Sequence, residues 1–299
     1  MDELAAVLAI LASVAFALAA TLWQKAALSV GVEPGAPKAF ARLLTNWVWL
    51  LGLAAQILGV VLQAAALDRG RVAIIQPLLV TTIIWAMPLG YFLTHQTITS
   101  RHIVGAAIIV VGLATFASVG DPAAGVDNAP TSDWIAAFLV IAAICVGLLL
   151  FARRGGLSMR AAVFGAVAGT LYGVSATLMK PVVEDLHAEG FEHVLTTWEL
   201  WVMAVTGIVG FYLQQISLAT GRLVTSVATV SVANPVVSVM LGALVLQERL
   251  DKTPSWHAVV AIGALAAALL GAIIVASASE EKAEAEAEIG TGQAGVQPA

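Results

Sequence analysis

The chain has few charges and almost no sulfur available for cross-linking. Only 11% of its 299 residues are Asp, Glu, Lys or Arg, and it contains a single cysteine, Cys145. A soluble globular domain carries about 25% charged residues, because much of its surface faces water. One cysteine excludes an intrachain disulfide framework. The scarcity of charge argues against an ordinary soluble fold.

The sequence also lacks the short motifs of common enzyme and nucleotide-binding classes. It has no G-x-S-x-G, P-loop, H-E-x-x-H or paired-cysteine pattern. Its basic residues form no cluster beyond a few arginines in the predicted loops, so nucleic-acid binding is not indicated. We therefore expect a protein that is not an enzyme and that holds no cofactor or resident metal.

Long uncharged stretches dominate what is present. Hydrophobic residues make up 60% of the chain, and the mean hydropathy is +0.94. A helix needs roughly 20 apolar residues to cross the hydrocarbon core of a bilayer. Nine stretches of about that length contain no Asp, Glu, Lys or Arg: 4–24, 43–67, 72–100, 102–120, 134–152, 161–179, 200–221, 223–247 and 253–279.

Only helices and closed barrels satisfy all their backbone hydrogen bonds in lipid. The nine stretches are continuously apolar and lack the alternation of a barrel strand. The sequence therefore predicts an all-α, polytopic membrane helix bundle with nine transmembrane helices, in contact with the lipid bilayer.

An internal repeat divides the chain. Leu44-Thr45-Asn46-Trp47 matches Leu195-Thr196-Thr197-Trp198, and the same offset of 151 residues pairs Gln63 with Gln214 and Gly70-Arg71 with Gly221-Arg222. We predict a first four-helix repeat in 1–120, a linker loop and fifth transmembrane helix in 121–155, a second four-helix repeat in 156–279, and a disordered acidic tail in 280–299.

The two repeats are expected to have opposite orientations. Five crossings, an odd number, separate their starting points, so the second repeat enters the membrane from the other side. Inverted repeats of this kind recur in secondary transporters, where the substrate site lies between the halves near the midplane. Because the duplication supplies both halves, we expect a monomer, with a homodimer as the alternative.

Lys and Arg are unevenly divided between the two ends of the predicted bundle. The end that carries the N-terminus, here called side A, holds five, and the opposite end, side B, holds nine. Loops on the cytoplasmic side are enriched in Lys and Arg. The sequence therefore predicts a multi-pass protein of the cell membrane with its N-terminus outside and its C-terminus in the cytoplasm.

Two segments resemble the drug/metabolite transporter superfamily. They are Gly70-Arg71-Val72-Ala73-Ile74-Ile75-Gln76-Pro77-Leu78, and the stretch from Asn234-Pro235 to Glu248-Arg249-Leu250, which is similar to the EamA-type half-repeat. The inverted 4+1+4 layout is similar to that of NIPA-type magnesium transporters. The resemblance implies a secondary transporter or facilitator that moves a small organic metabolite or drug by alternating access, or alternatively a divalent-cation (magnesium) transporter.

The charge map favours the organic solute. Magnesium prefers hard oxygen ligands, commonly carboxylates, and the nine uncharged stretches offer none. Val60 stands where NIPA-type proteins carry an acid, and Gln96 replaces the acid of the Leu-x-Glu pattern. A neutral, zwitterionic or weakly polar solute fits such a bundle better.

Uncharged polar and aromatic residues in the predicted spans are the candidate substrate-binding set: Gln24, Gln63, Gln76, Trp85, Tyr172, Ser175, Thr177, Gln214 and Asn234. Lys25, Lys180 and Glu248 are candidate gating or interface residues. The alternative is that the amides only join helices, that the lysines extend to the membrane surface, and that the protein is a non-transporting membrane scaffold.

Overall fold

The computed structural model describes residues 3–30, 42–69, 78–119, 130–245 and 255–294. These residues form helices joined by turns, with no β-strand among them. The helices are α1 (Glu3–Val30), α3 (Trp47–Arg69), α5 (Thr82–Thr94), α6 (Ser100–Val119), α7 (Thr131–Ala152), α8 (Leu157–Ala188), α9 (Phe191–Val194), α10 (Trp198–Ala219), α11 (Leu223–Leu244) and α12 (Ser255–Ala294).

Six helices are long and apolar enough to cross a membrane: α1, α7, Leu157–Met179 of α8, α10, α11 and Val259–Ser279 of α12. Three shorter apolar helical segments accompany them: Trp47–Gln63, Leu78–Thr94 and Ser100–Phe116. The protein is therefore a helical, multi-pass membrane protein, as the sequence predicts. The crossing of all nine segments remains a prediction.

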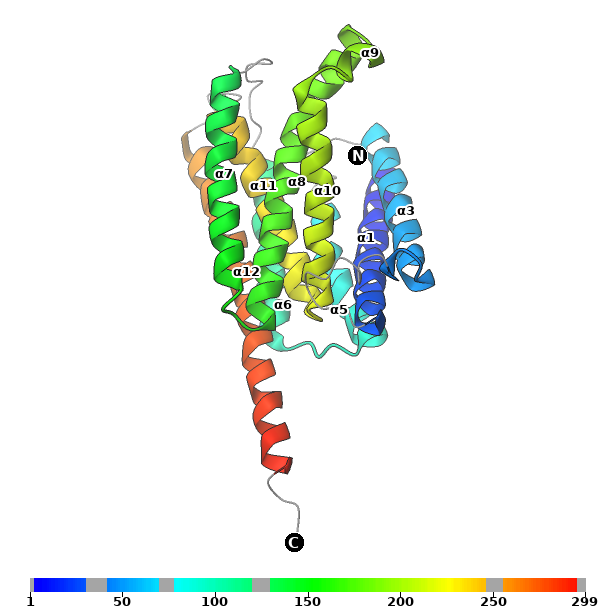
Figure 1. The fold of residues 1–299 in the computed structure, drawn as a ribbon, viewed down its shortest axis with the longest axis vertical. Coiled ribbons are helices and arrows are strands. Elements are labelled where there is room, and N and C mark those ends of the chain that lie inside the picture. Colours follow the sequence, from blue (N-terminus) through cyan, green and yellow to red (C-terminus); the bar gives the residue numbers. More distant parts are fainter. Residues whose placement is uncertain (1–2, 31–41, 70–77, 120–129, 246–254, 295–299) are drawn as a thin grey trace.

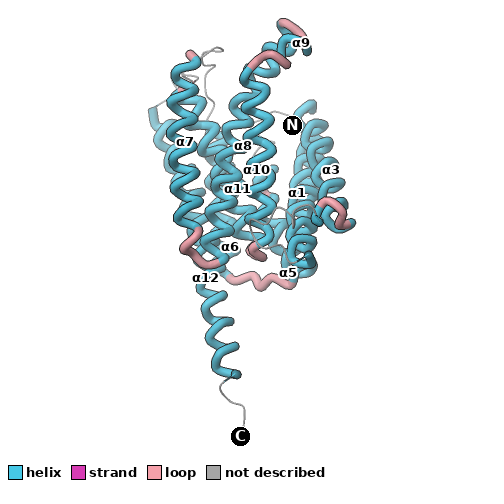
Figure 2. Tube along the Cα trace, in the orientation of Figure 1, coloured by secondary structure: helices cyan, strands magenta, loops and turns pink. Residues whose placement is uncertain are grey.

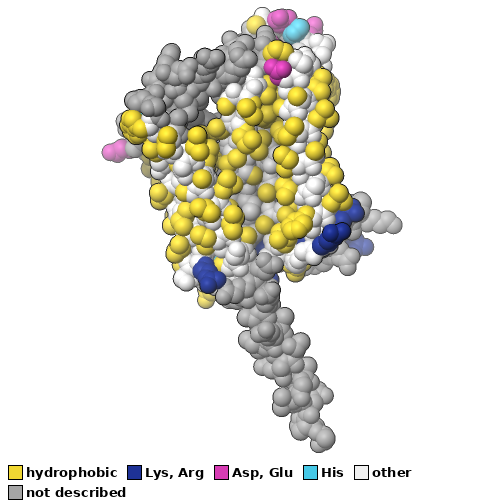
Figure 3. Space-filling view, turned by 90° about the vertical axis from the view of Figure 1, so that its left-hand side faces the viewer, with side chains coloured by type: hydrophobic (Ala, Val, Ile, Leu, Met, Phe, Trp, Pro, Cys, Tyr) yellow, Lys and Arg dark blue, Asp and Glu magenta, His cyan; other side chains and the backbone are white. Residues whose placement is uncertain are grey.

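The outer surface is apolar along the middle of the bundle and charged at its ends. Figure 3 shows hydrophobic side chains over the middle of one face, Lys and Arg gathered toward the lower end, and Asp, Glu and His toward the upper end. Large side chains such as Val111, Leu139 and Val259 are mostly exposed. Because soluble proteins rarely expose contiguous apolar patches of this extent, this surface is suited to lipid.

The helices pack in two groups. In the first, α1 packs along α3 and α5, and in the second, α8 packs along α10 and α11. Helices α6 and α12, which we count with the first and the second group by their order in the chain, lie against each other, whereas α7 is attached to the outside of α8 (Figures 1 and 2). Figure 1 shows α1 running down the page and α8 running up it, so that α1 begins at the end of the bundle opposite to the one where α8 begins. Side A is at the top of this view and side B at the bottom.

Glycine permits the closest approach between helices. A Cβ atom on Gly105 of α6 would lie 2.8 Å from the carbonyl oxygen of Gly271 in α12, and one on Gly112 would lie 2.7 Å from that of Ala264. Small residues allow such close contact between membrane helices. Helix association in lipid depends on this packing, because lipid tails are as apolar as the helix surface and supply no hydrophobic driving force. The α6–α12 contact therefore depends on these glycines.

The acidic end of the chain differs from its prediction. Helix α12 continues to Ala294, through much of the segment predicted to be a disordered tail. The segment alternates Glu and Ala over 284–288, and both residues are strong helix formers. Helix propensity therefore extends α12 beyond the charge-free stretch that ends at 279.

Gly112→Val tests the α6–α12 contact. The added side chain would overlap the backbone of α12, and overpacking of this kind costs about 1–3 kcal/mol. We expect the apparent Tm of the detergent-purified protein to fall by several degrees. Gly147→Val in α7 is the matched control, because a Cβ there meets no atom within 4 Å. Equal losses of Tm in both variants would contradict the contact.

Candidate functional site

Three aromatic rings meet where the two helix groups touch. Trp23 of α1, Trp49 of α3 and Phe211 of α10 have ring centroids 5.2 Å apart for Trp23–Phe211 and 6.3 Å apart for the other two pairs. Both tryptophans are almost completely buried. Gly52 makes room for Trp23, because a Cβ at that position would lie 2.6 Å from the indole ring. We call Trp23, Trp49 and Phe211 the aromatic cluster.

The amide side chain of Gln215 borders this cluster. The indole N–H of Trp49 donates to Gln215 Oε1 across 3.2 Å, which joins α3 of the first group to α10 of the second. Gln215 is 2% exposed and Gln24, the residue after Trp23, is 0% exposed. The site thus combines aromatic surface with the buried amide of Gln215, and α1 carries a second buried amide directly after Trp23.

Several buried polar atoms of these residues have no hydrogen-bond partner among the described residues. They are the indole nitrogen of Trp23, both amide atoms of Gln24 and Nε2 of Gln215. Each buried group left without a partner costs about 1–3 kcal/mol, so such groups in a native protein call for a water, a ligand or a second conformation. Trp23 belongs to the aromatic cluster, Gln215 contacts it, and Gln24 is next to Trp23 in the chain, which makes this the leading candidate site.

At side B, side chains of one helix group make hydrogen bonds to the other group. Besides Trp49–Gln215, the amide of Gln96 donates to the carbonyl oxygen of Gly221. His102 Nε2 lies 2.9 Å from Ser279 Oγ, joining α6 to α12. We call these three hydrogen bonds, which join the two groups, the side-B latch.

Four of the predicted site residues contact partners within the second helix group. Tyr172 donates its hydroxyl proton to Gln214 Oε1 across 2.7 Å, and both side chains are half-buried. Ser175 donates to the Met203 carbonyl oxygen of α10. Asn234 Oδ1 accepts a long hydrogen bond of 3.5 Å from Ser238. These contacts brace α8 against α10 and stabilise α11, as the packing alternative anticipates.

The remaining predicted residues are dispersed. Thr177 donates to the carbonyl oxygen of Gly173 in its own helix. Gln63 is half-buried and makes no hydrogen bond with another described residue, and Trp85 is 37% exposed. Of the predicted set, Gln24 is the residue adjacent in sequence to a member of the aromatic cluster.

The candidate gating residues are only partly described. Lys25 is exposed on α1, toward side B. Lys180 lies within α8, which continues past it to Ala188, and its side chain is outside the described residues. Gln76 and Glu248 also lie outside them.

The sequence reasoning missed Trp23, Trp49, Phe211 and Gln215. The repeat singled out Gln214 because Gln63 occupies the matched position, but neighbouring residues of a helix point about 100° apart. Gln214 consequently faces α8, while Gln215 reaches Trp49 of the other group. A search for polar residues without a repeat counterpart would have found Gln215, which pairs with Ala64.

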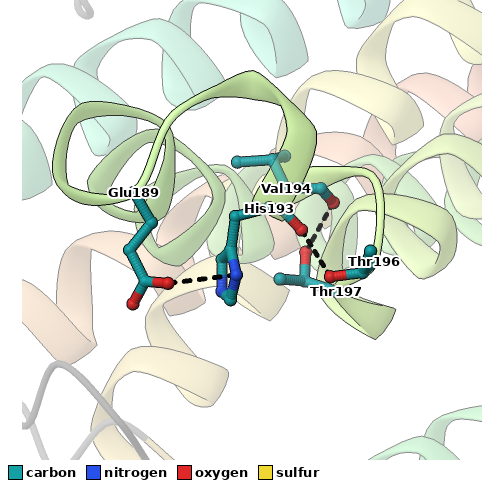
Figure 4. Close-up of polar contacts among 5 residues, drawn as sticks. All are labelled: Glu189, His193, Val194, Thr196 and Thr197. Carbon is teal, nitrogen blue, oxygen red and sulfur yellow. Dashed lines mark hydrogen bonds and ion pairs between the residues drawn. The ribbon is translucent and has the colours of Figure 1, made fainter.

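A separate polar cluster lies in the side-A turn around α9. Glu189 and His193 approach to 3.0 Å, with side chains 57% and 43% exposed, and Thr196 and Thr197 donate to nearby carbonyl oxygens (Figure 4). Within the described residues, no three His, Cys, Asp or Glu side chains are grouped as metal ligands would be. We interpret this turn as a solvated helix connection.

The chain is 29% identical over 202 residues to an uncharacterised protein of Corynebacterium glutamicum, an alignment that covers 68% of this chain and 70% of that protein. No family model matches the sequence, and no solved structure matches it.

Gln24→Leu tests whether the buried amide is stabilised by anything in the protein. Leucine has a similar size and no unpaired polar atoms, so we expect a rise of a few degrees in apparent Tm, because a cost of about 1–3 kcal/mol is removed. Gln96→Leu is the contrasting control, since it deletes a hydrogen bond to Gly221 and should lower Tm. A fall in Tm for Gln24→Leu would show that the amide is already paired.

Proposed function

We propose that the protein is a secondary transporter or facilitator that moves a small organic solute across the membrane by alternating access. The observation that carries this proposal is the set of unpaired, buried hydrogen-bonding atoms on Trp23 and Gln215, where the two helix groups meet, and on Gln24, the next residue of α1. A helical membrane protein has no reason to keep such groups for stability alone. Groups of this kind are suited to a solute that enters and leaves.

The packing supports an inverted 4+1+4 repeat with nine crossings. Helix α1 packs on α3 and α5 as α8 packs on α10 and α11, and the predicted repeat mates α5 and α11, and α6 and α12, pack on each other. A pseudo-two-fold axis produces both features: equivalent contacts inside each repeat, and self-pairing of equivalent helices across the axis. The peripheral position of α7 fits a linker helix.

Alternating access requires that the two groups separate at one end at a time. The hydrogen bonds of the side-B latch join the two groups at one end, and we therefore interpret this conformation as closed at side B. A neutral hydrogen bond contributes about 0.5–1.5 kcal/mol net. Release of three such bonds is a cost that thermal fluctuations and the binding of a solute can offset.

The chemistry of the site indicates the class of solute. Gln24 and Gln215 offer both donors and acceptors, and the aromatic cluster offers apolar and π surface. No charged side chain is among these residues. We therefore propose an uncharged or zwitterionic metabolite or drug-like molecule of small size, bound by amide hydrogen bonds and aromatic contact.

The proposed topology places repeat-equivalent residues on opposite sides of the membrane. Thr45 and Thr196 are both exposed and match at the repeat offset. In a Cys145→Ala background, we expect a membrane-impermeant thiol reagent added to intact cells to label Thr196→Cys and to spare Thr45→Cys until the cells are opened. Labelling of both from outside would reject the inverted repeat, and labelling of Thr45→Cys alone would reverse the orientation.

Transport is tested with purified protein in liposomes. A thermal-shift screen of uncharged and zwitterionic metabolites identifies solutes that stabilise the folded state, and radiolabelled uptake of those solutes is then measured. We expect saturable uptake, reduced at least tenfold in Gln24→Leu and Gln215→Leu. Gln63→Leu, an equivalent change away from the aromatic cluster, should reduce it much less.

The same liposomes separate the competing interpretations. Magnesium influx measured with a trapped indicator, together with no organic flux, would favour a divalent-cation transporter. Absence of both fluxes from protein that passes the topology test would favour a membrane scaffold. Uptake that is unaffected by Gln24→Leu and Gln215→Leu would move the site elsewhere.

A further inference from the structure

We propose that the side-B latch encloses a binding site for a phosphate-type anion, separate from the aromatic cluster. A cavity of about 180 Å³ lies beside the latch. Its lining combines both helix groups: Thr94, His95, Gln96, Thr97 and His102 from the first, and Gly221, Arg222 and Ser279 from the second. The volume corresponds to roughly six water molecules, which is room for one phosphate group and a few waters.

Arg222 supplies the charge. Its side chain is half-buried at the cavity and makes no ion pair within the described part of the chain. No Asp or Glu is among the described residues that line the cavity. A guanidinium group offers several N–H donors in a planar fork that matches the oxygens of a phosphate group. A half-buried cation without a counter-ion beside a polar cavity is suited to an anionic ligand.

The helix N-termini at the cavity add to the positive electrostatic potential that Arg222 creates there. Helix α11 begins at Leu223, directly after Arg222, and α6 begins at Ser100, between the lining residues Thr97 and His102. Helix N-termini carry partial positive charge and unpaired N–H groups, which bind anions. The N-terminus of α11 has no side-chain capping hydrogen bond, so its first-turn N–H groups are not occupied by a side chain.

The turn between α10 and α11 holds Arg222 in place at the cavity. Gly221 adopts a φ of +81°, a conformation that side-chain-bearing residues rarely adopt, and its carbonyl oxygen accepts from Gln96. This hydrogen bond holds the turn, and with it Arg222, against the first helix group. Thr97 lines the cavity and is exposed, so the cavity has a polar wall toward the solvent at side B.

An anion bound here would join the two helix groups. Arg222 belongs to the second group, whereas Thr97 and His102 belong to the first, so a bridging phosphate would stabilise the conformation closed at side B. The phosphate can be that of an anionic lipid headgroup at the membrane surface or that of a soluble phosphate, because both present the same oxygens. The site does not depend on the proposed transport.

Binding is measured on the whole protein with two probes. Inorganic phosphate is titrated into protein in an uncharged maltoside detergent, with chloride at equal ionic strength as the reference, and apparent Tm and calorimetric affinity are recorded. In the second arm, protein in nanodiscs of phosphatidylcholine with or without phosphatidylglycerol is released, and retained lipid is identified by native mass spectrometry. Binding in either arm supports the site and tells which source supplies the phosphate.

Substitutions assign the binding to this cavity. We expect Arg222→Gln to weaken phosphate or phosphatidylglycerol binding at least tenfold, and Arg153→Gln, which removes an exposed arginine from the same end of the bundle, to leave it unchanged. Thr97→Asp places a carboxylate at the exposed wall of the cavity beside Arg222 and should abolish binding without disturbing a buried contact. Equal effects of Arg222→Gln and Arg153→Gln, or no saturable binding in either arm, would overturn the proposal.

Discussion

Hydrogen bonding in a solvent that offers none is the constraint on which this structure depends. Inside a bilayer each polar group must find its partner within the protein, so the backbone becomes helical and most side chains become apolar. Many of the polar side chains that remain are paired with the backbone of their own helix, as Thr177 is, or with a neighbouring helix, as Tyr172 is. The unpaired atoms of Trp23, Gln24 and Gln215 stand out against this background.

The same constraint explains why packing and polar contact are divided along the bundle. Glycine and alanine bring α6 onto α12 and α8 onto α11, where a Cβ atom on Gly173 would lie 2.7 Å from the carbonyl oxygen of Asn234. These contacts need no polar groups. The described cross-group hydrogen bonds are instead concentrated at side B, together with the aromatic cluster and the cavity beside Arg222. One end of the bundle therefore carries the specific, breakable contacts.

Under the proposed inverted repeat, the two halves are similar in arrangement and unlike in chemistry. Gln215 has Ala64 at its matched position, and Trp49 has Leu200, so the Trp49–Gln215 contact has no symmetry mate. The proposed inverted symmetry would permit two conformations of similar energy, while an asymmetric site would allow them to differ in affinity. Our proposal of alternating access rests on one such site between the two halves.

The sequence by itself determined the fold class, because the spacing of charges follows directly from the thickness of the bilayer. The all-helical character of the described residues and the multi-pass architecture needed no tertiary information. It also pointed to Gln24, but through polarity alone, and it chose Gln214 over Gln215. Which side chains meet depends on helix rotation and on the approach of glycines such as Gly52. Helix rotation and glycine contacts are decided only when the helices pack. Consecutive residues are separated by a rotation of 100°, and an apolar helix carries little periodic signal to show which face is inside.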